Sequence, residues 1–226
     1  MVDAVLIDID GTLMDSNPLH TLAWLRAFRR LGREVEANTV LHLMGMGGDQ
    51  LAPTVLGEEA EEESARAKEL WTEEFSEKGL VEHVEPLPGA ADLLRALKER
   101  GIPTALASSG EQQDIEHYVE LLGGREMFTE LVSSADVEQT KPAPDIFAVA
   151  VERLGKPASA VVIGDTVFDI EAARKLGIPC VGVLTGGLER STLVDAGAIA
   201  VYTDAADVVA HLDAILGVEA AQAAAD

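Results

Sequence analysis

From residue 87 onwards, short apolar runs alternate with amphipathic segments. Five of these runs have the length and branching of buried strands, and they occupy 103–107, 130–133, 161–163, 180–184 and 198–201. Apolar residues at helical spacing predict helices at 90–100, 112–122, 145–154, 169–176 and 205–216. Alternating strands and helices form a parallel sheet that is covered on both faces, with right-handed crossovers. The sequence therefore predicts an α/β fold with a Rossmann-like parallel sheet.

One more strand-like run, 5–7, precedes this series, and no strand signal follows it until residue 87. Helical spacing begins at Pro18, a residue suited to the first turn of a helix, and Ser16 or Asn17 is expected to cap it. Further helices are expected at 37–44, 49–55 and 58–78.

These patterns divide the chain into two parts. We predict a core formed by 1–15 and 87–226, which an all-helical insert at 16–86 interrupts after the first strand. The alanine-rich end of the chain, 219–226, is expected to fray.

The first strand-like run ends abruptly in the sequence Asp8-Ile9-Asp10-Gly11-Thr12. In an extended chain, Asp8 and Asp10 would point the same way because side chains alternate with a period of two. Gly11 allows the backbone to leave the strand through a conformation that other residues resist. The carboxyl ends of strands are where open α/β sheets bind their ligands, so we expect this acidic pair in a functional site.

Other polar residues follow later strands or lie in adjoining loops. Ser108 and Ser109 follow the strand expected at 103–107, Lys141 lies in a proline-rich loop, and Asp165 and Asp169 follow the strand expected at 161–163. Singly, each is a common turn or capping residue. Together, in chain order and near the same edge of a parallel sheet, they indicate one site.

In these motifs the chain resembles the haloacid dehalogenase superfamily of phosphotransferases, and the resemblance covers essentially the whole chain. Four motifs carry it: Asp8-Ile9-Asp10-Gly11-Thr12, Ser108, Lys141, and Gly164-Asp165 with Asp169. The helical insert is similar to the mobile C1-type cap of members such as phosphoglycolate phosphatase and β-phosphoglucomutase. The resemblance implies a Rossmann-like core with this cap over the active site.

The resemblance also implies roles for individual residues. Asp8 is expected to be the nucleophile that forms an aspartyl-phosphate, and Asp10 the general acid for the leaving group and then the base for water. His20 lies soon after the first motif, where this family often has a histidine; a contact near the substrate and a packing role both remain open.

A magnesium ion is the expected cofactor, since hard oxygen ligands suit it. Asp8, Asp165 and Asp169 are its expected carboxylate ligands, and Asp10 is expected to bind it through the backbone carbonyl. Ser108, Ser109 and Lys141 are expected to hold the phosphate oxygens.

Several reactions are known on this fold, and the sequence favours one of them. Asp10 argues against a dehalogenase, because a departing halide needs no proton. A β-phosphoglucomutase-like mutase would have an arginine for the second phosphate in the segment 44–49, which here has no basic residue. Phosphonoacetaldehyde hydrolases of this superfamily also differ at the position of Asp10 and use a cap lysine to form a Schiff base; Lys68 and Lys78 lie in a charged helical segment and are expected to be solvated. The prediction is a magnesium-dependent phosphatase of small phosphorylated metabolites, with a phosphosugar mutase and a non-enzymatic binding protein as alternatives.

Composition limits the partners and the compartment. The formal net charge of −23 disfavours nucleic acid or an anionic membrane as a partner. Cys180 is the single cysteine, expected to be a buried thiol, so no intramolecular disulfide can form. No secretory signal or membrane span is recognisable, and a cytoplasmic protein is expected. The identity of the substrate and the oligomeric state stay open.

Overall fold

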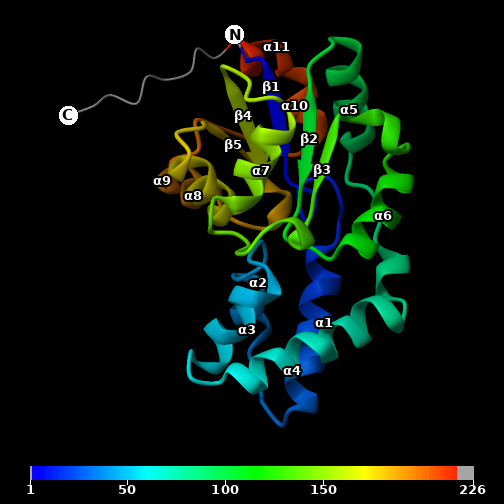
Figure 1. Cartoon of the computed structure of the whole chain (residues 1–226), viewed down its shortest axis with the longest axis vertical. Coiled ribbons are helices and arrows are strands. Elements are labelled where there is room, and N and C mark those ends of the chain that lie inside the picture. Colours follow the sequence, from blue (N-terminus) through cyan, green and yellow to red (C-terminus); the bar gives the residue numbers. More distant parts are fainter. Residues whose placement is uncertain (1, 218–226) are drawn as a thin grey trace, which may run out of the picture.

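Six parallel strands form one sheet in the computed structural model, which describes residues 2–217. The strands are β1 (Ala4–Ile7), β2 (Thr104–Ala107), β3 (Glu130–Val132), β4 (Ala160–Gly164), β5 (Cys180–Val183) and β6 (Ala200–Tyr202). Their order across the sheet is β3-β2-β1-β4-β5-β6 (Figure 1). The predicted α/β fold with a Rossmann-like parallel sheet is confirmed. The expected fraying of 219–226 lies outside the described residues.

The two faces of the sheet bury separate apolar clusters, because neighbouring side chains of a strand point to opposite faces. Val5 and Ile7 of β1 belong to the cluster that includes α5 (Ala90–Glu99) and α6 (Gln112–Leu121). Leu6 belongs to the opposite cluster, together with side chains of three further helices. Those helices are α7 (Asp145–Arg153), α8 (Val167–Lys175) and α9 (Arg190–Ala196). Both faces of β1 are therefore buried, which explains its uninterrupted apolar sequence.

The described part of the chain ends in two short helices, α10 (Ala205–Ala210) and α11 (Leu212–Leu216), where one helix was predicted. The helix α9 was not predicted, because only Leu193 of its seven residues is buried and its apolar pattern is weak. Within residues 2–217, no helix combines the length and the apolar character that a membrane span requires. Cys180 is buried at the start of β5, as expected.

Four α-helices lie between β1 and α5 in the sequence: α1 (Asn17–Arg30), α2 (Ala37–Leu41), α3 (Gly48–Leu56) and α4 (Glu61–Thr72). A short 3-10 helix, Leu80–His83, follows them. A π-helical turn, Glu73–Glu77, continues α4, so the helix predicted at 58–78 changes its winding near its end. These helices gather beyond the carboxyl ends of the strands (Figure 1). The two crossings of the chain run side by side, since Asp15 N–H donates to Glu85 O at 2.9 Å and Leu87 N–H donates to Leu13 O at 2.8 Å.

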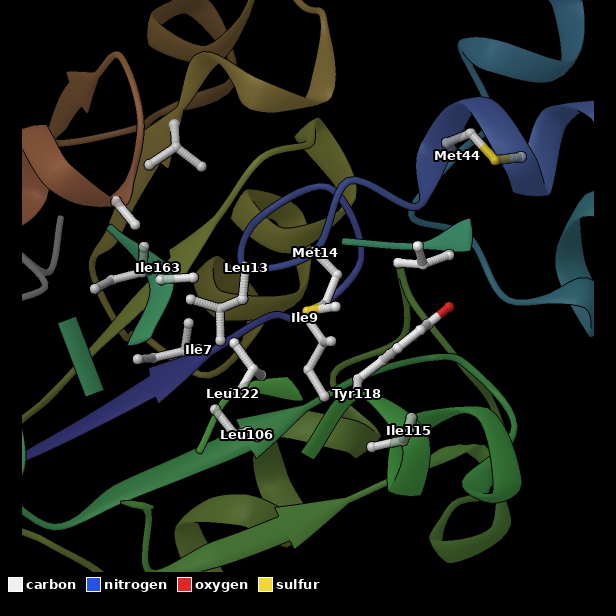
Figure 2. Packing of buried hydrophobic residues seen from close by; sticks show 14 of the residues in the cluster. Ile7, Ile9, Leu13, Met14, Met44, Leu106, Ile115, Tyr118, Leu122 and Ile163 are labelled. Atoms are coloured by element: carbon white, nitrogen blue, oxygen red, sulfur yellow. The ribbon is translucent and has the colours of Figure 1, made fainter. Parts of the chain in front are cut away.

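Figure 2 shows the packing around the end of β1, where Ile7 lies between Leu106 of β2 and Ile163 of β4. Ile9 and Leu13, from the loop that follows, are fully buried beside it. The loop that carries the acidic residues is therefore anchored by alternate apolar side chains, and its polar residues are held on a rigid support.

Candidate active site

The loop after β1 turns sharply, and Gly11 makes the turn possible. Its φ is +77°, and a Cβ at this position would come within 2.2 Å of both Asn17 Nδ2 and Asp165 Oδ2. A glycine is therefore required at position 11 for two reasons: the backbone is left-handed there, and no space is left for a Cβ atom. The turn directs Asp8 and Asp10 into two different hydrogen-bond networks.

Asp8 lies in a buried network with Lys141 and Asp169. The Lys141 Nζ donates to Asp8 Oδ1 and lies 2.7 Å from Asp169 Oδ1. All three side chains are nearly inaccessible, with exposures of 1–5%. Burial raises the pKa of Asp8 to about 7; Lys141 opposes this shift, and the charges of Asp169 and Asp10 add to it. The two carboxylates raise the pKa of Lys141 against the effect of its burial, so the lysine is charged.

Asp165, at the end of β4, joins the same cluster from the neighbouring strand. Its carboxylate accepts hydrogen bonds from the Thr12 hydroxyl at 2.9 Å and from Asn17 Nδ2 at 3.0 Å. Gly186 packs against it so closely that a Cβ there would come within 2.1 Å of Asp165 Oδ2. Burial, followed by the charges of Asp8 and Asp169, raises the pKa of Asp165 well above its usual value.

Three carboxylates could hold a metal ion together. Asp8, Asp165 and Asp169 each have an oxygen within 4.8 Å of the others, and all three are buried. Lys141 is the one cation that contacts them among the described residues, which leaves an excess of buried negative charge. Hard oxygen donors with uncompensated charge fit a small divalent cation such as Mg²⁺.

Asp169 has a structural task as well. It is the third residue of α8, and its Oδ2 accepts from Thr166 N–H at 3.0 Å and from the Thr166 hydroxyl at 2.7 Å. This is a reciprocal capping box in which Thr166, not Asp169, is the N-cap. The other oxygen, Oδ1, faces Lys141. The capping box therefore fixes the orientation in which Asp169 meets the cluster.

Asp10 is held in a separate network by three side chains. Its Oδ1 accepts from the Ser16 hydroxyl at 2.7 Å and lies 2.9 Å from His20 Nε2, while its Oδ2 accepts from the Ser108 hydroxyl at 2.8 Å. Burial alone would raise the pKa of Asp10, but His20 and these hydrogen bonds outweigh it and lower the pKa to about 2. Asp10 is therefore ionised when no substrate is bound.

The same contacts correct the expected helix cap. Ser16 occupies the N-cap position of α1 but makes no capping bond; its hydroxyl donates to Asp10. Asn17 donates to Asp165 instead. Both residues are used by the acidic cluster, a possibility that local capping preferences do not reveal.

His20 combines the two roles that the sequence left open. Its ring stacks on Phe75 with centroids 4.0 Å apart and lies 5.5 Å from Trp71, while Nε2 faces Asp10. Phe75 lies within the π-helical turn that follows α4. This aromatic support fixes the plane of the imidazole and with it the direction of the contact to Asp10.

A cavity opens above Asp8 and Asp10, between the sheet and the four helices. Its lining includes Asp8, Asp10, Asn17, His20, Trp24, Met44–Gly48, Lys68, Trp71 and Ser109–Glu111. Ser109 lines the cavity, and its hydroxyl accepts weakly from Lys141 N–H at 3.4 Å. Ser108 is fully buried, with its hydroxyl between Asp10 and Gly110 N–H. The helical segment closes over the cavity through Asp49, which accepts from the hydroxyl and, at 3.3 Å, from the N–H of Thr140.

Lys68 is partly exposed, with 42% of its side chain accessible, but it also takes part in the site, which the sequence does not predict. It lines the cavity, and its Nζ lies 2.9 Å from Oε1 of Glu111, the N-cap residue of α6. Neither residue could be assigned to the site from the sequence, because Lys68 lies in a charged helix and Glu111 at a helix start, where such residues are common. Only the approach of α4 to the start of α6 brings them together.

The family model of haloacid dehalogenase-like hydrolases matches residues 2–177. The protein SUPPRESSOR OF QUENCHING 1, chloroplastic, from Arabidopsis thaliana is 31% identical over 217 residues, which are 92% of this chain. The chain spans 20% of the length of that plant protein.

Two other matches cover nearly all of the related protein. The fructose-1-phosphate phosphatase YqaB from Escherichia coli is 29% identical over 180 residues, which cover 79% of this chain and 95% of YqaB. The crystal structure of a hydrolase from Pseudomonas syringae superposes with a TM-score of 0.87 at 30% identity, covering 94% of this chain and 98% of the other. The match to the family model, which includes all the acidic residues of the site, and the agreement in fold lead to one conclusion: the chain belongs to the haloacid dehalogenase-like hydrolases.

Proposed function

We propose that the protein is a Mg²⁺-dependent phosphatase that hydrolyses small phosphomonoesters through an aspartyl-phosphate at Asp8. One observation carries the proposal: a buried nucleophile candidate, Asp8, lies next to Lys141, while a second aspartate, Asp10, is held separately at the same cavity. The resemblance to YqaB, a phosphatase of comparable length, supports the same reaction class.

In the first step, Asp8 attacks phosphorus. A bond forms between the Asp8 carboxylate and phosphorus, and the bond from phosphorus to the leaving oxygen breaks. Lys141 holds the carboxylate and offsets the negative charge of the phosphoryl group. A bound Mg²⁺ would be held by Asp8, Asp165 and Asp169, and it supplies further neutralisation of the phosphate oxygens.

Asp10 moves the protons. The dianionic phosphate next to Asp10 raises the pKa of this carboxyl from its low value, since a nearby like charge disfavours the ionised form. Asp10 takes up a proton from solvent as the substrate binds and then donates it to the leaving oxygen. After the alcohol departs, ionised Asp10 accepts a proton from the water that attacks the aspartyl-phosphate and releases phosphate.

We also propose that residues 16–86 act as a cap that closes over this site. The adjacent crossings at Asp15 and Leu87 form the hinge, and the contact of Asp49 with Thr140 holds the closed state. Closure excludes bulk water and places the helical segment over the leaving group.

Hydrolysis of p-nitrophenyl phosphate by the purified protein tests the proposal. Phosphate release should require Mg²⁺ and stop in excess chelator. In Asp8→Asn the release should fall to background, and no acid-stable or hydroxylamine-sensitive phosphoprotein should form. Full activity of Asp8→Asn, or of the wild-type protein in excess chelator, would contradict the mechanism.

A further inference from the structure

We propose that Glu111 and Lys68 form a selectivity pair that favours leaving groups with neutral hydroxyls and rejects substrates with a second anionic group. This inference rests on the proposed phosphatase function and names the class of substrate that the site would take. It concerns two residues that the phosphoryl-transfer steps above do not use.

The pair lies on the side of the cavity where the leaving group must be. A general acid has to contact the leaving oxygen, so the leaving group lies on the Asp10 side of the phosphate. Glu111 follows Gly110, where an added Cβ would come within 3.3 Å of Asp10 Oδ2. Glu111 is thus a chain neighbour of the residue that packs against Asp10, and its side chain lines the same cavity.

The structure of the cap brings Lys68 to this carboxylate. The Lys68 stem passes Gly48, where a Cβ would lie 3.5 Å from Lys68 Cγ, and its Nζ reaches Glu111 Oε1 at 2.9 Å. The Glu111 side chain makes no capping bond to its own helix. The side chains of Lys68 and Glu111 are 42% and 33% exposed, so the pair adds little to folding and stays accessible to a ligand.

The ion pair of Lys68 and Glu111 can bind a hydroxyl group, which accepts a hydrogen bond from the ammonium and donates one to the carboxylate. A second anionic group on the substrate would be attracted by Lys68 but repelled by the carboxylate of Glu111, since one lysine cannot neutralise both negative charges. Of the described residues that line the cavity, Lys68 is the single lysine or arginine. The preferred substrate is therefore a monophosphate of a small polyol or sugar, and carboxylated or bisphosphorylated esters are disfavoured.

Two substrates that differ in one group provide the test. Glycerol 3-phosphate and 3-phosphoglycerate share their backbone, but the second has a carboxylate in place of one CH₂OH group. We expect wild-type kcat/KM to favour glycerol 3-phosphate by about tenfold or more. The carboxylate of 3-phosphoglycerate would lie next to the negative charge of Glu111, and this repulsion disfavours its binding. Glu111→Gln should lower this ratio several-fold, and Glu111→Lys should lower it further.

Lys68→Gln should move the ratio in the opposite direction, because it leaves the Glu111 carboxylate uncompensated. Glu116→Gln, an exposed residue of the same helix that does not line the cavity, removes the same charge and should leave the ratio unchanged. A purely structural role for the pair would not shift the ratio in opposite directions.

The outcomes separate this inference from the proposed function. If the wild-type protein hydrolyses p-nitrophenyl phosphate but the Glu111 and Lys68 variants leave the ratio unchanged, the selectivity pair is wrong and the phosphatase proposal stands. If it hydrolyses none of the three esters with Mg²⁺, both are wrong. A wild-type preference for 3-phosphoglycerate would also overturn the inference.

Discussion

His20 Nε2 lies 2.9 Å from Asp10 Oδ1, and the His20 ring is stacked on Phe75 from the π-helical turn after α4. This relationship links a residue of the helical segment to the residue that we propose as the acid and base. Because His20 and Phe75 both belong to the part of the chain that we propose as a mobile cap, opening of the cap would move the stacked imidazole away from Asp10.

Asp10→Asn should separate two kinds of substrate. The variant keeps the nucleophile but has no proton to donate, so hydrolysis of an alkyl phosphate should fall by about 10²-fold or more. The loss should be smaller for p-nitrophenyl phosphate, whose leaving group needs little protonation. Steady-state kinetics with both esters measures the difference, and equal losses would count against Asp10 as the general acid.

Substitutions at His20 and Phe75 test whether the imidazole positions Asp10. His20→Phe keeps an aromatic ring in the stack but removes the contact to Asp10, whereas Phe75→Leu removes the stacking and keeps the contact. We expect His20→Phe to lower kcat for an alkyl phosphate by about tenfold, as expected for part of a general-acid contribution, with little change in KM. Phe75→Leu should have the smaller effect, and the reverse order would show that the histidine serves packing.

Lys141→Met should destabilise the protein. Lys141 is the cation between two buried carboxylates, and removing one partner of a buried ion pair costs about 3–5 kcal/mol. Urea unfolding in the presence of chelator measures this loss. Lys98→Met, a substitution of an exposed lysine on α5, is the control and should change the free energy of unfolding little. A Lys141→Met protein as stable as the wild type would show that Asp8 and Asp169 are not charged together in the folded state.

Glu74 should contribute stability that depends on pH. Hydrogen bonding by Lys78 lowers the pKa of Glu74 below its ordinary value of 4.5, with Arg30 of α1 adding to the shift. A carboxyl with a lowered pKa in the folded state stabilises the protein above the unfolded pKa, and this contribution disappears as the pH falls below about 4.5.

Glu74→Gln should therefore lower the melting temperature at pH 7 by about 2–4 °C, the shift expected for about 1 kcal/mol in a chain of this size. The difference from the wild type should shrink below pH 4.5. Glu77→Gln, an exposed residue of the same π-helical turn, is the matched control. A difference between Glu74→Gln and the wild type that is independent of pH would exclude this ionic contribution.

Hydrolysis should dominate over isomerisation of a sugar phosphate. Segment 44–49 has no basic residue, its Asp49 carboxylate bonds to Thr140, and Lys68 is paired with Glu111. With β-glucose 1-phosphate and a bisphosphate activator, free phosphate should appear faster than glucose 6-phosphate. Faster accumulation of glucose 6-phosphate would support the mutase alternative and would indicate that Lys68 leaves Glu111 to bind a second phosphate.

The sequence alone determined the class of fold and the order of its main elements. Apolar periodicity carries this information because each strand must bury both faces and each covering helix one stripe. This periodic signal was weakest for α9, which has a single buried side chain, and it did not reveal the π-helical turn that follows α4 and packs against α1. The division of the chain into core and cap at residues 16 and 86 remains a prediction.

The sequence also singled out Asp8, Asp10, Lys141, Asp165 and Asp169, because they recur at strand ends and in an adjoining loop, in the order typical of a known family. Only the tertiary structure decided how these residues are distributed between two networks and which unrecognised residues join them. Asn17, Lys68, Glu111 and Gly186 each look ordinary in their local sequence. Their contacts join residues that are 21 (Gly186 and Asp165), 43 (Lys68 and Glu111) and 148 (Asn17 and Asp165) positions apart in the sequence. Local preferences cannot encode such contacts, since they arise only in the folded structure.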